Sequence, residues 1–314
     1  MERPEAAISR RTMLLSVLAG SGALALAGCT AAARGPVGRG PATRATSQKT
    51  RASASPTARP TLRLPSRPGD VLGGSVTLTG TGLAAVTAVR FAAAEATIAS
   101  TTATSVAVTI PAALDYQPAT VPVTLVTPAG TFAAGGYTYA ALTPVGRQMA
   151  YALKYWKHYN TARYGSLNSV GGDCANFASQ TLVARGWAMN DTWYNHDAAE
   201  HWTPAWGYVP AMDDYFLSHG AALGLERLAE DQRDRVARGD LGVFDWENNG
   251  DRDHVEVVDR ITRTDDGTIK VALASHNLDY AYRDLDETIT KQHPGATMHF
   301  WHFIDPTAVG GLAA

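Results

Sequence analysis

Apolar and polar side chains alternate in short runs in the first half of the chain. The runs are residues 75–79, 86–91, 105–110 and 121–126, and Gly and Pro interrupt the chain between them. A period of two is typical of strands whose side chains point alternately to the two faces of a sheet, and regular turn signals are typical of a sandwich. The pattern predicts an all-β sandwich over residues 67–141.

The pattern changes to a helical period beyond residue 142. Residues 145–159 place apolar side chains along one stripe, and so does a second segment that begins at Cys174 and ends near Gly186. Glycine is a common stop signal for a helix. The sequence therefore predicts two helices, and the second carries a thiol in its first turn.

Three later runs predict antiparallel strands, at residues 241–246, 254–261 and 269–276. In the second run His254 lies opposite the apolar face, and in the third run unbroken alternation places His276 on a side with small residues that admit a packed helix. The helices and strands together predict an α+β domain over residues 142–307. Both histidines are expected to face the helix that begins at Cys174.

The first 28 residues have the features of a signal peptide. Basic residues precede an apolar run, residues 13–27, that is too short to span a bilayer. Leu-Ala-Gly-Cys at residues 26–29 resembles the lipobox of bacterial lipoproteins, which implies that Cys29 becomes the lipidated N-terminus, and residues 9–14 resemble a twin-arginine export signal. We expect an exported bacterial protein anchored to the membrane at the cell surface. The alternative is an ordinary signal peptide in which the cysteine occurs by chance.

Charge divides the chain into three regions, although its net charge is only -2. Residues 1–68 carry 11 basic and 2 acidic side chains. Residues 69–141 carry 1 basic and 3 acidic side chains, and residues 142–314 carry 15 basic and 24 acidic side chains. The near-neutral total gives no electrostatic basis for binding nucleic acid. Residues 29–66 have almost no large apolar side chain, so we expect a disordered linker there.

Cys174 is the strongest candidate for a chemical role. The chain has only two cysteines, and acylation of Cys29 would leave Cys174 as a lone thiol in an exported protein, where structural cysteines normally pair. A buried cysteine that only fills space is the alternative. However, the N–H groups of a helix N-terminus stabilise a thiolate, and the preceding Gly171 and Gly172 admit close approach of a substrate backbone. These surroundings favour a nucleophile.

The first globular region resembles an IPT/TIG domain, an immunoglobulin-like module. The motifs that carry the resemblance are residues 73–83, 86–91, 126–130 and 137–139. The resemblance covers residues 68–140 and implies an immunoglobulin-like sandwich. The region has no cluster of acidic residues, His or Trp that would mark a binding site, so a spacer is favoured over a ligand-binding module.

The second globular region resembles the bacterial family called the putative amidase domain. Four motifs carry this resemblance, namely residues 171–180 (Gly-Gly-Asp-Cys-Ala-Asn-Phe-Ala-Ser-Gln), 239–246, 253–255 and 275–279. The resemblance covers residues 143–305. It implies a papain-like fold, similar to that of the NlpC-type cell-wall peptidases.

The family resemblance also implies roles for individual residues. Cys174 would be the nucleophile and His254 the general base, and His276 is the best match for the third polar residue that orients the imidazole. Asn277 and Asp279 lie close enough in sequence to compete for that third role.

Two further polar residues are candidates for the oxyanion hole. Asn168 lies six residues before Cys174, the spacing at which papain-like enzymes place an oxyanion-hole side chain. Tyr164 matches a position that is often Tyr in NlpC-type sites. An ordinary loop role is an equal alternative for both, and the backbone N–H of Cys174 is a donor in either case.

An acidic segment after the first predicted strand of this region has the spacing of a calcium loop. Asp245, Glu247, Asn249, Asp251 and Glu256 stand at positions 1, 3, 5, 7 and 12 of an EF-hand-like pattern. Its flanks are strands rather than helices, so an acidic hairpin turn without metal is the favoured interpretation. No cofactor is required for the expected chemistry, and calcium would only brace the following strand.

Together these features predict an exported, lipid-anchored cysteine hydrolase that cleaves an amide bond. Location and family resemblance indicate peptidoglycan stem peptides as the substrate, and the lipid anchor implies contact with the membrane. The alternative is a non-catalytic surface or cell-wall binding protein built on a hydrolase fold. The presence of both Cys174 and His254 favours the enzyme.

Overall fold

The computed structural model describes residues 59–307. The predicted signal peptide, Cys29 and most of the predicted linker lie outside the described residues. Within the described part, no helix has the length and apolar character needed to cross a bilayer.

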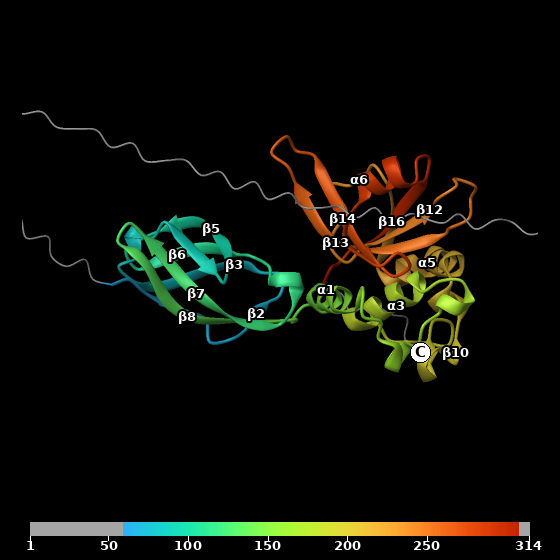
Figure 1. Cartoon of the computed structure of the whole chain (residues 1–314), viewed down its shortest axis with the longest axis horizontal. Coiled ribbons are helices and arrows are strands. Elements are labelled where there is room, and N and C mark those ends of the chain that lie inside the picture. Colours follow the sequence, from blue (N-terminus) through green and yellow to red (C-terminus); the bar gives the residue numbers. More distant parts are fainter. Residues whose placement is uncertain (1–58, 308–314) are drawn as a thin grey trace, which may run out of the picture. The chain divides into compact units, whose positions relative to one another are not determined.

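The first globular part is an eight-stranded β-structure, drawn in cyan to green in Figure 1. Its strands follow the order β1-β3-β6-β5-β4-β7-β8-β2, and all neighbours are antiparallel except β2 and β8. The elements are β1 (Thr61–Arg63), β2 (Gly69–Asp70), β3 (Gly74–Thr81), η1 (Leu83–Ala85), β4 (Ala88–Phe91), β5 (Ala94–Thr101), β6 (Ser105–Ile110), η2 (Leu114–Tyr116), β7 (Ala119–Thr127) and β8 (Gly130–Ala140).

Alternating burial builds the core of this part. Val106 and Val108 of β6 are buried together with Leu125 of β7, whereas Thr109 between buried neighbours is exposed. The alternation therefore confirms the strands expected in this region. The structure also has a strand that the sequence pattern did not predict, because β1 lies in the expected linker and packs Leu62 against the core.

The second globular part contains helices and a six-stranded antiparallel sheet in the order β11-β16-β12-β13-β14-β15. Its helices are α1 (Pro144–Tyr155), α2 (Thr161–Tyr164), η3 (Asn168–Val170), α3 (Cys174–Arg185), η4 (Asp197–Ala199), α4 (Pro204–Gly207), α5 (Val209–Leu223), α6 (Leu285–Glu287) and η5 (Thr288–Gln292). Its strands are β9 (Asn195–His196), β10 (His201–Trp202), β11 (Leu225–Ala229), β12 (Leu241–Asp245), β13 (His254–Arg263), β14 (Ile269–Ser275), β15 (Tyr280–Asp284) and β16 (Thr297–Phe303).

Local signals explain where the two main helices begin and end. Thr143 caps α1 by accepting a hydrogen bond from the N–H of Gly146, and Pro144 occupies the first helical position. The helix ends at Tyr155, four residues before the predicted end. Helix α3 ends at Gly186, whose φ of 123° favours glycine.

Helix α3 packs on β13 and β14, and this packing positions the site (Figure 1). Phe177 and Leu182 of α3 lie in one core cluster with Val255 and Val257 of β13. Strand β13 pairs with β12 through its first half and carries a β-bulge between Val258 and Arg260. The bulge separates the half of β13 that begins at His254 from its outer half.

Candidate active site

Cys174 is the first residue of α3 and is 7% exposed. The loop before it depends on glycine, since Gly171 and Gly172 have φ angles of 129° and 145°. A Cβ atom on Gly172 would in addition lie 3.3 Å from the side-chain oxygen of Asn277. The thiol therefore sits at a helix N-terminus, next to a glycine pair of which Gly171 has open space at its Cβ position.

His254 is the partner of the thiol. It is the first residue of β13, it is buried, and its ring interacts with the side chain of Cys174. Burial alone would lower the pKa of His254, but the nearby Cys174 and Glu256 outweigh burial and raise it to about 10. The surroundings of the ring thus favour the imidazolium form of His254.

Glu256 supplies a carboxylate to the same imidazole. Its Oε1 atom lies 3.3 Å from Nε2 of His254, a charge contact whose geometry is not that of an aligned hydrogen bond. Arg283 donates from Nη1 to the same oxygen at 2.6 Å, and Nη2 of Arg283 donates to Gln292. The carboxylate is fully buried and is fixed between two cationic groups.

The role of Glu256 as a partner of His254 was not predicted from the sequence. The signal was present, because residues two apart on a strand share a face, but Glu256 was considered only as a calcium ligand. The five residues of the alternative calcium set do not converge. Glu256 contacts His254 and Arg283 instead of the acidic loop, and the side chain of Asn249 accepts a hydrogen bond from the N–H of Asp251.

His276 lies away from the position that the sequence suggested. Its Nδ1 lies 2.6 Å from Oδ2 of Asp173, and its Nε2 lies 2.9 Å from the carbonyl oxygen of Tyr155, so both nitrogens have partners other than His254. The physical reason is the end of β14. That strand stops at Ser275 after a register shift, and His276 begins a tight turn.

The two alternatives for the third role also lie apart from His254. Asn277, with a φ of 59°, accepts a hydrogen bond from the N–H of Asp173 and donates to the side chain of Asn168. Asp279 accepts a hydrogen bond of 2.7 Å from the hydroxyl of Tyr159. These contacts anchor the loop before the nucleophile rather than the imidazole.

Neither oxyanion candidate lines the groove at Cys174 in the described chain. The side chain of Asn168 accepts a hydrogen bond from the side-chain amide of Asn277. Tyr164 is 2% exposed and stacks its ring against Trp206 in the core. The donor that remains at the nucleophile is the backbone N–H of Cys174.

A groove with a volume of about 470 Å³ opens at Cys174. Gly171, Gly172 and the exposed Val170 form one side, and Trp202 and the exposed Tyr208 supply aromatic surface. The loop of residues 251–253 closes another side and brings two acidic side chains and Arg252 to it.

Arg252 fixes that loop to α5. Its Nε donates to Asp213 at 2.6 Å and its Nη2 donates to the exposed Asp214 at 3.0 Å. Asp213 is fully buried and also accepts hydrogen bonds from the rings of His299 and Trp301. One wall of the groove is thus held by a buried carboxylate.

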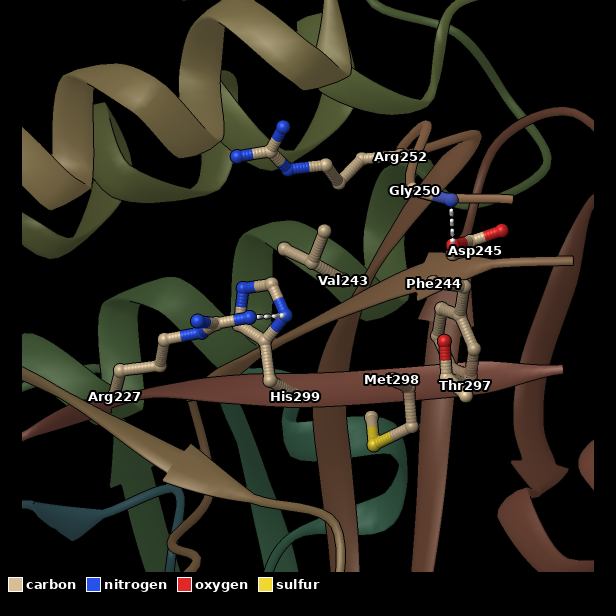
Figure 2. A pocket seen from close by; sticks show the side chains of 9 residues that line it. All are labelled: Arg227, Val243, Phe244, Asp245, Gly250, Arg252, Thr297, Met298 and His299. Atoms are coloured by element: carbon tan, nitrogen blue, oxygen red, sulfur yellow. Dashed lines mark hydrogen bonds between the residues drawn. The ribbon is translucent and has the colours of Figure 1, made fainter. Parts of the chain in front are cut away.

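A second cavity of about 400 Å³ lies over β11, β12 and β16 (Figure 2). Figure 2 shows Arg227 hydrogen-bonded to His299 on one side of it, and Gly250 hydrogen-bonded to Asp245 on the other. The cavity shares Arg252 with the groove, but Cys174 does not line it.

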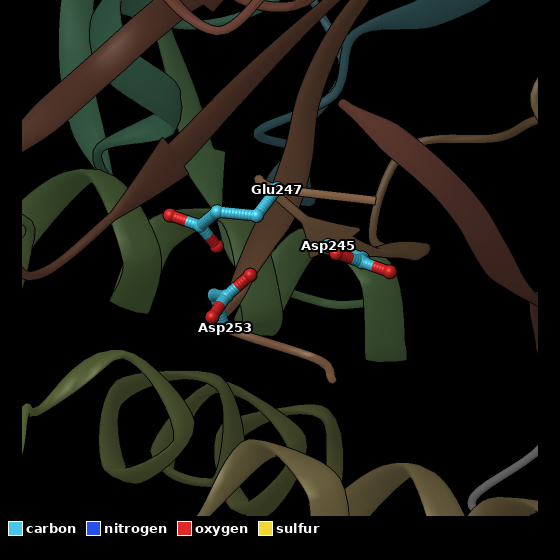
Figure 3. Close-up of side chains that lie close together, drawn as sticks. All are labelled: Asp245, Glu247 and Asp253. Atoms are coloured by element: carbon cyan, nitrogen blue, oxygen red, sulfur yellow. The ribbon is translucent and has the colours of Figure 1, made fainter. Parts of the chain in front are cut away.

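Three carboxylates meet at the turn after β12. Oxygen atoms of Asp245, Glu247 and Asp253 lie within 4.8 Å of one another (Figure 3). Asp245 already accepts hydrogen bonds from the N–H groups of Asn249 and Gly250, as expected for an acidic hairpin turn.

Comparisons with known proteins agree with this division of the chain. Residues 145–301, half of the chain, match the family model described as "Putative amidase domain", and residues 68–140 match the IPT/TIG domain, which makes the first part an immunoglobulin-like sandwich.

Among solved structures, the chain is similar to SGBP-B of the mixed-linkage glucan utilization locus of Bacteroides ovatus, determined in complex with a mixed-linkage heptasaccharide. That likeness has 10% identity and a TM-score of 0.22, and it covers 77% of this chain and 52% of that chain, so the chain spans about half of that protein. No curated protein matches the chain.

Proposed function

We propose, on the premise that the chain belongs to the putative amidase domain family, that its second globular part is a cysteine-dependent hydrolase of amide bonds. The observation that carries the proposal is the alignment of Cys174, His254 and Glu256. A thiol at a helix N-terminus, an imidazole that interacts with it and a carboxylate beside the imidazole are the three parts of a nucleophilic triad. A helix that carries the nucleophile and an antiparallel sheet that carries the base also support a papain-like, NlpC-type arrangement.

The reaction follows from the roles of these groups. The thiolate of Cys174 attacks the amide carbonyl, and the N–H of Cys174 stabilises the oxyanion that forms. The imidazolium of His254 gives its proton to the leaving amine, and the C–N bond breaks to leave an acyl-enzyme. His254 then takes a proton from water, which attacks the thioester and releases the carboxylic acid and the thiolate.

We further propose peptidoglycan stem peptides as the substrate. The open backbone at Gly171 suits an extended peptide, since nothing lies within 4 Å of its Cβ position and it lines the groove. The lipobox-like sequence at Cys29 supports a location at the cell surface, where this substrate occurs. Trp202 and Tyr208 provide flat apolar surface for the rest of the ligand.

Digestion of purified cell walls tests both parts of the proposal. The mature protein should release fragments with new amine and carboxyl ends, and mass spectrometry of the fragments names the bond that is cleaved. The matched control is Cys174→Ala, which should release nothing. Wall binding by the wild-type protein without any cleavage would instead support the non-catalytic alternative.

A further inference from the structure

A buried pair, Asp173 and His276, lies directly before the nucleophile. Neither side chain is exposed, and Nδ1 of His276 lies 2.6 Å from Oδ2 of Asp173. The other oxygen of Asp173 accepts hydrogen bonds from the N–H of Leu167 at 2.6 Å and from the side-chain amide of Asn176 at 2.9 Å. Two N–H donors thus converge on one oxygen of the carboxylate and the imidazole lies against the other, and these are contacts that an ionised carboxylate accepts.

The contacts of His276 indicate how many hydrogens its ring carries. A backbone carbonyl can only accept, so Nε2, at 2.9 Å from the carbonyl oxygen of Tyr155, carries a hydrogen. Nδ1 faces the carboxylate of Asp173 and carries the second hydrogen when that carboxylate is ionised. A ring with a hydrogen on both nitrogens is an imidazolium.

Aromatic rings cover both faces of this imidazole. The ring of Tyr159 stacks on it with 3.6 Å between centroids, and the ring of Phe177 lies at 4.2 Å on α3. Burial and the hydrogen bond to Asp279 raise the pKa of Tyr159 to about 12, so its phenol stays neutral. Aromatic faces are favourable surroundings for a buried cation.

A carboxylate next to the nucleophile has an electrostatic cost that this cation offsets. Asp173 is adjacent to Cys174 in sequence, and a second buried acid, Glu256, contacts His254. Uncompensated negative charge at Asp173 would oppose formation of the thiolate. The remaining charged groups that face the thiol lie across the groove, on the loop of residues 251–253, where Arg252 accompanies two acidic side chains.

We infer that His276 is a positioning residue that is held as an imidazolium and balances the charge of Asp173, so that this acid can anchor the loop before Cys174 without opposing the thiolate. The inference deepens the proposed function and rests on Cys174 being the nucleophile. It also gives His276 a role different from that of Glu256, which acts on the ring of His254.

Alkylation of Cys174 by iodoacetamide, followed against pH in the full chain by mass spectrometry, tests this role. His276→Gln should move the midpoint of the alkylation profile upward by about 1 pH unit, because the charge of Asp173 is then unbalanced. The double variant Asp173→Asn/His276→Gln removes both charges and should bring the midpoint back toward that of the wild type. The matched control is His201→Gln, which breaks the exposed pair of His201 with Asp197 and should change nothing.

The outcomes separate this inference from the proposed function. A His276→Gln profile that coincides with the wild type, or a double variant displaced as far as the single one, would overturn the charge-balancing role. If native Cys174 reacts only after denaturation, the proposed nucleophile is wrong instead. Nitrogen-15 NMR of the native chain needs no variant to fold, and it should reveal two buried imidazoles with hydrogens on both nitrogens, those of His254 and His276. A neutral ring at His276 would contradict the inference.

Discussion

Glu256 lies two residues beyond His254 on the same strand, with its Oε1 atom 3.3 Å from Nε2 of the imidazole. Arg283 donates to that same oxygen, and all three side chains are buried. A carboxylate in this place can orient the ring and stabilise its charged form without contacting a substrate.

Replacing Glu256 with Gln tests that relationship. The variant keeps an oxygen for Arg283 but removes the charge beside His254, so we expect kcat to fall about 100-fold and KM to change little. Steady-state kinetics on a soluble wall fragment measures both. Asp279→Asn is the matched control, because Asp279 contacts Tyr159 rather than His254 and its loss should be mild. Equal losses in the two variants would count against Glu256 as the orienting group.

The charge state of His254 predicts the alkaline limb of the pH profile. Its pKa of about 10, against an ordinary 6.5, keeps the imidazole charged throughout the neutral range. We therefore expect kcat/KM to decline only as the pH approaches about 10. Glu256→Gln removes one cause of the raised pKa and should move this limb to lower pH. A limb that stays in place in the variant would contradict the electrostatic coupling of the two residues.

The same raised pKa predicts how folding stability depends on pH. A group whose pKa is higher in the folded state contributes stability that is fully present below its unfolded pKa, here about 6.5, and that is lost as the pH rises to about 10. Urea unfolding at several pH values across that window should reveal this loss in the wild type. Cys174→Ala removes the larger of the two influences that raise the pKa of His254. In this variant the free energy of unfolding should therefore depend less on pH across the same window.

Asp213 and Asp214 form a matched pair for testing the wall of the groove. Burial would raise the pKa of Asp213, but hydrogen bonds from His299, Trp301 and Arg252 outweigh burial and lower it to about 2. Asp213→Asn should destabilise the protein by about 3 kcal/mol, because buried donors lose their charged partner. Asp214→Asn removes an exposed contact with the same Arg252 and should cost less than about 1 kcal/mol. Urea titration compares the two, and similar costs would contradict the importance assigned to burial.

The expected anchor can be tested independently of the active site. Cys29→Ser should release the protein from the membrane fraction, because the lipid would no longer be attached, and should leave its hydrolytic rate unchanged. Fractionation followed by an activity assay measures both. Retention of the variant in the membrane fraction would remove the lipoprotein interpretation.

The hydrophobic period predicted the elements that carry the site but not the contacts between them. The helical stripe after Cys174 placed the thiol in the first turn of α3, where the structure has it. The position of His276 was not predictable from alternation, since a register shift near Leu273 ends the regular period, and positive φ angles at Asn277 and Leu278 form the turn that follows.

The spacing of the acidic residues was likewise not enough to predict which side chains of residues 245–256 lie together. An EF-hand-like pattern assumes that the chain stays in one loop until its last ligand, but β13 has already begun at His254 when Glu256 is reached. Strand formation turns that carboxylate toward a histidine and an arginine. The short strand β1 was missed for a simpler reason, because three residues with a single partly buried leucine are too few to give a detectable period.

Because His254 and Glu256 lie on the same strand, one pairing register of β13 positions both side chains during folding. A slip of β13 by one residue against β12 would turn both side chains to the opposite face of the sheet in the same step. A misregistered molecule would thus be wholly inactive rather than partly impaired, so specific activity reports the fraction of molecules in correct register. The bulge after Val258 limits the effect of a register error in the outer half of β13. The extra residue at the bulge can take up a shift of one residue, so that the pairing at His254 and Glu256 is kept.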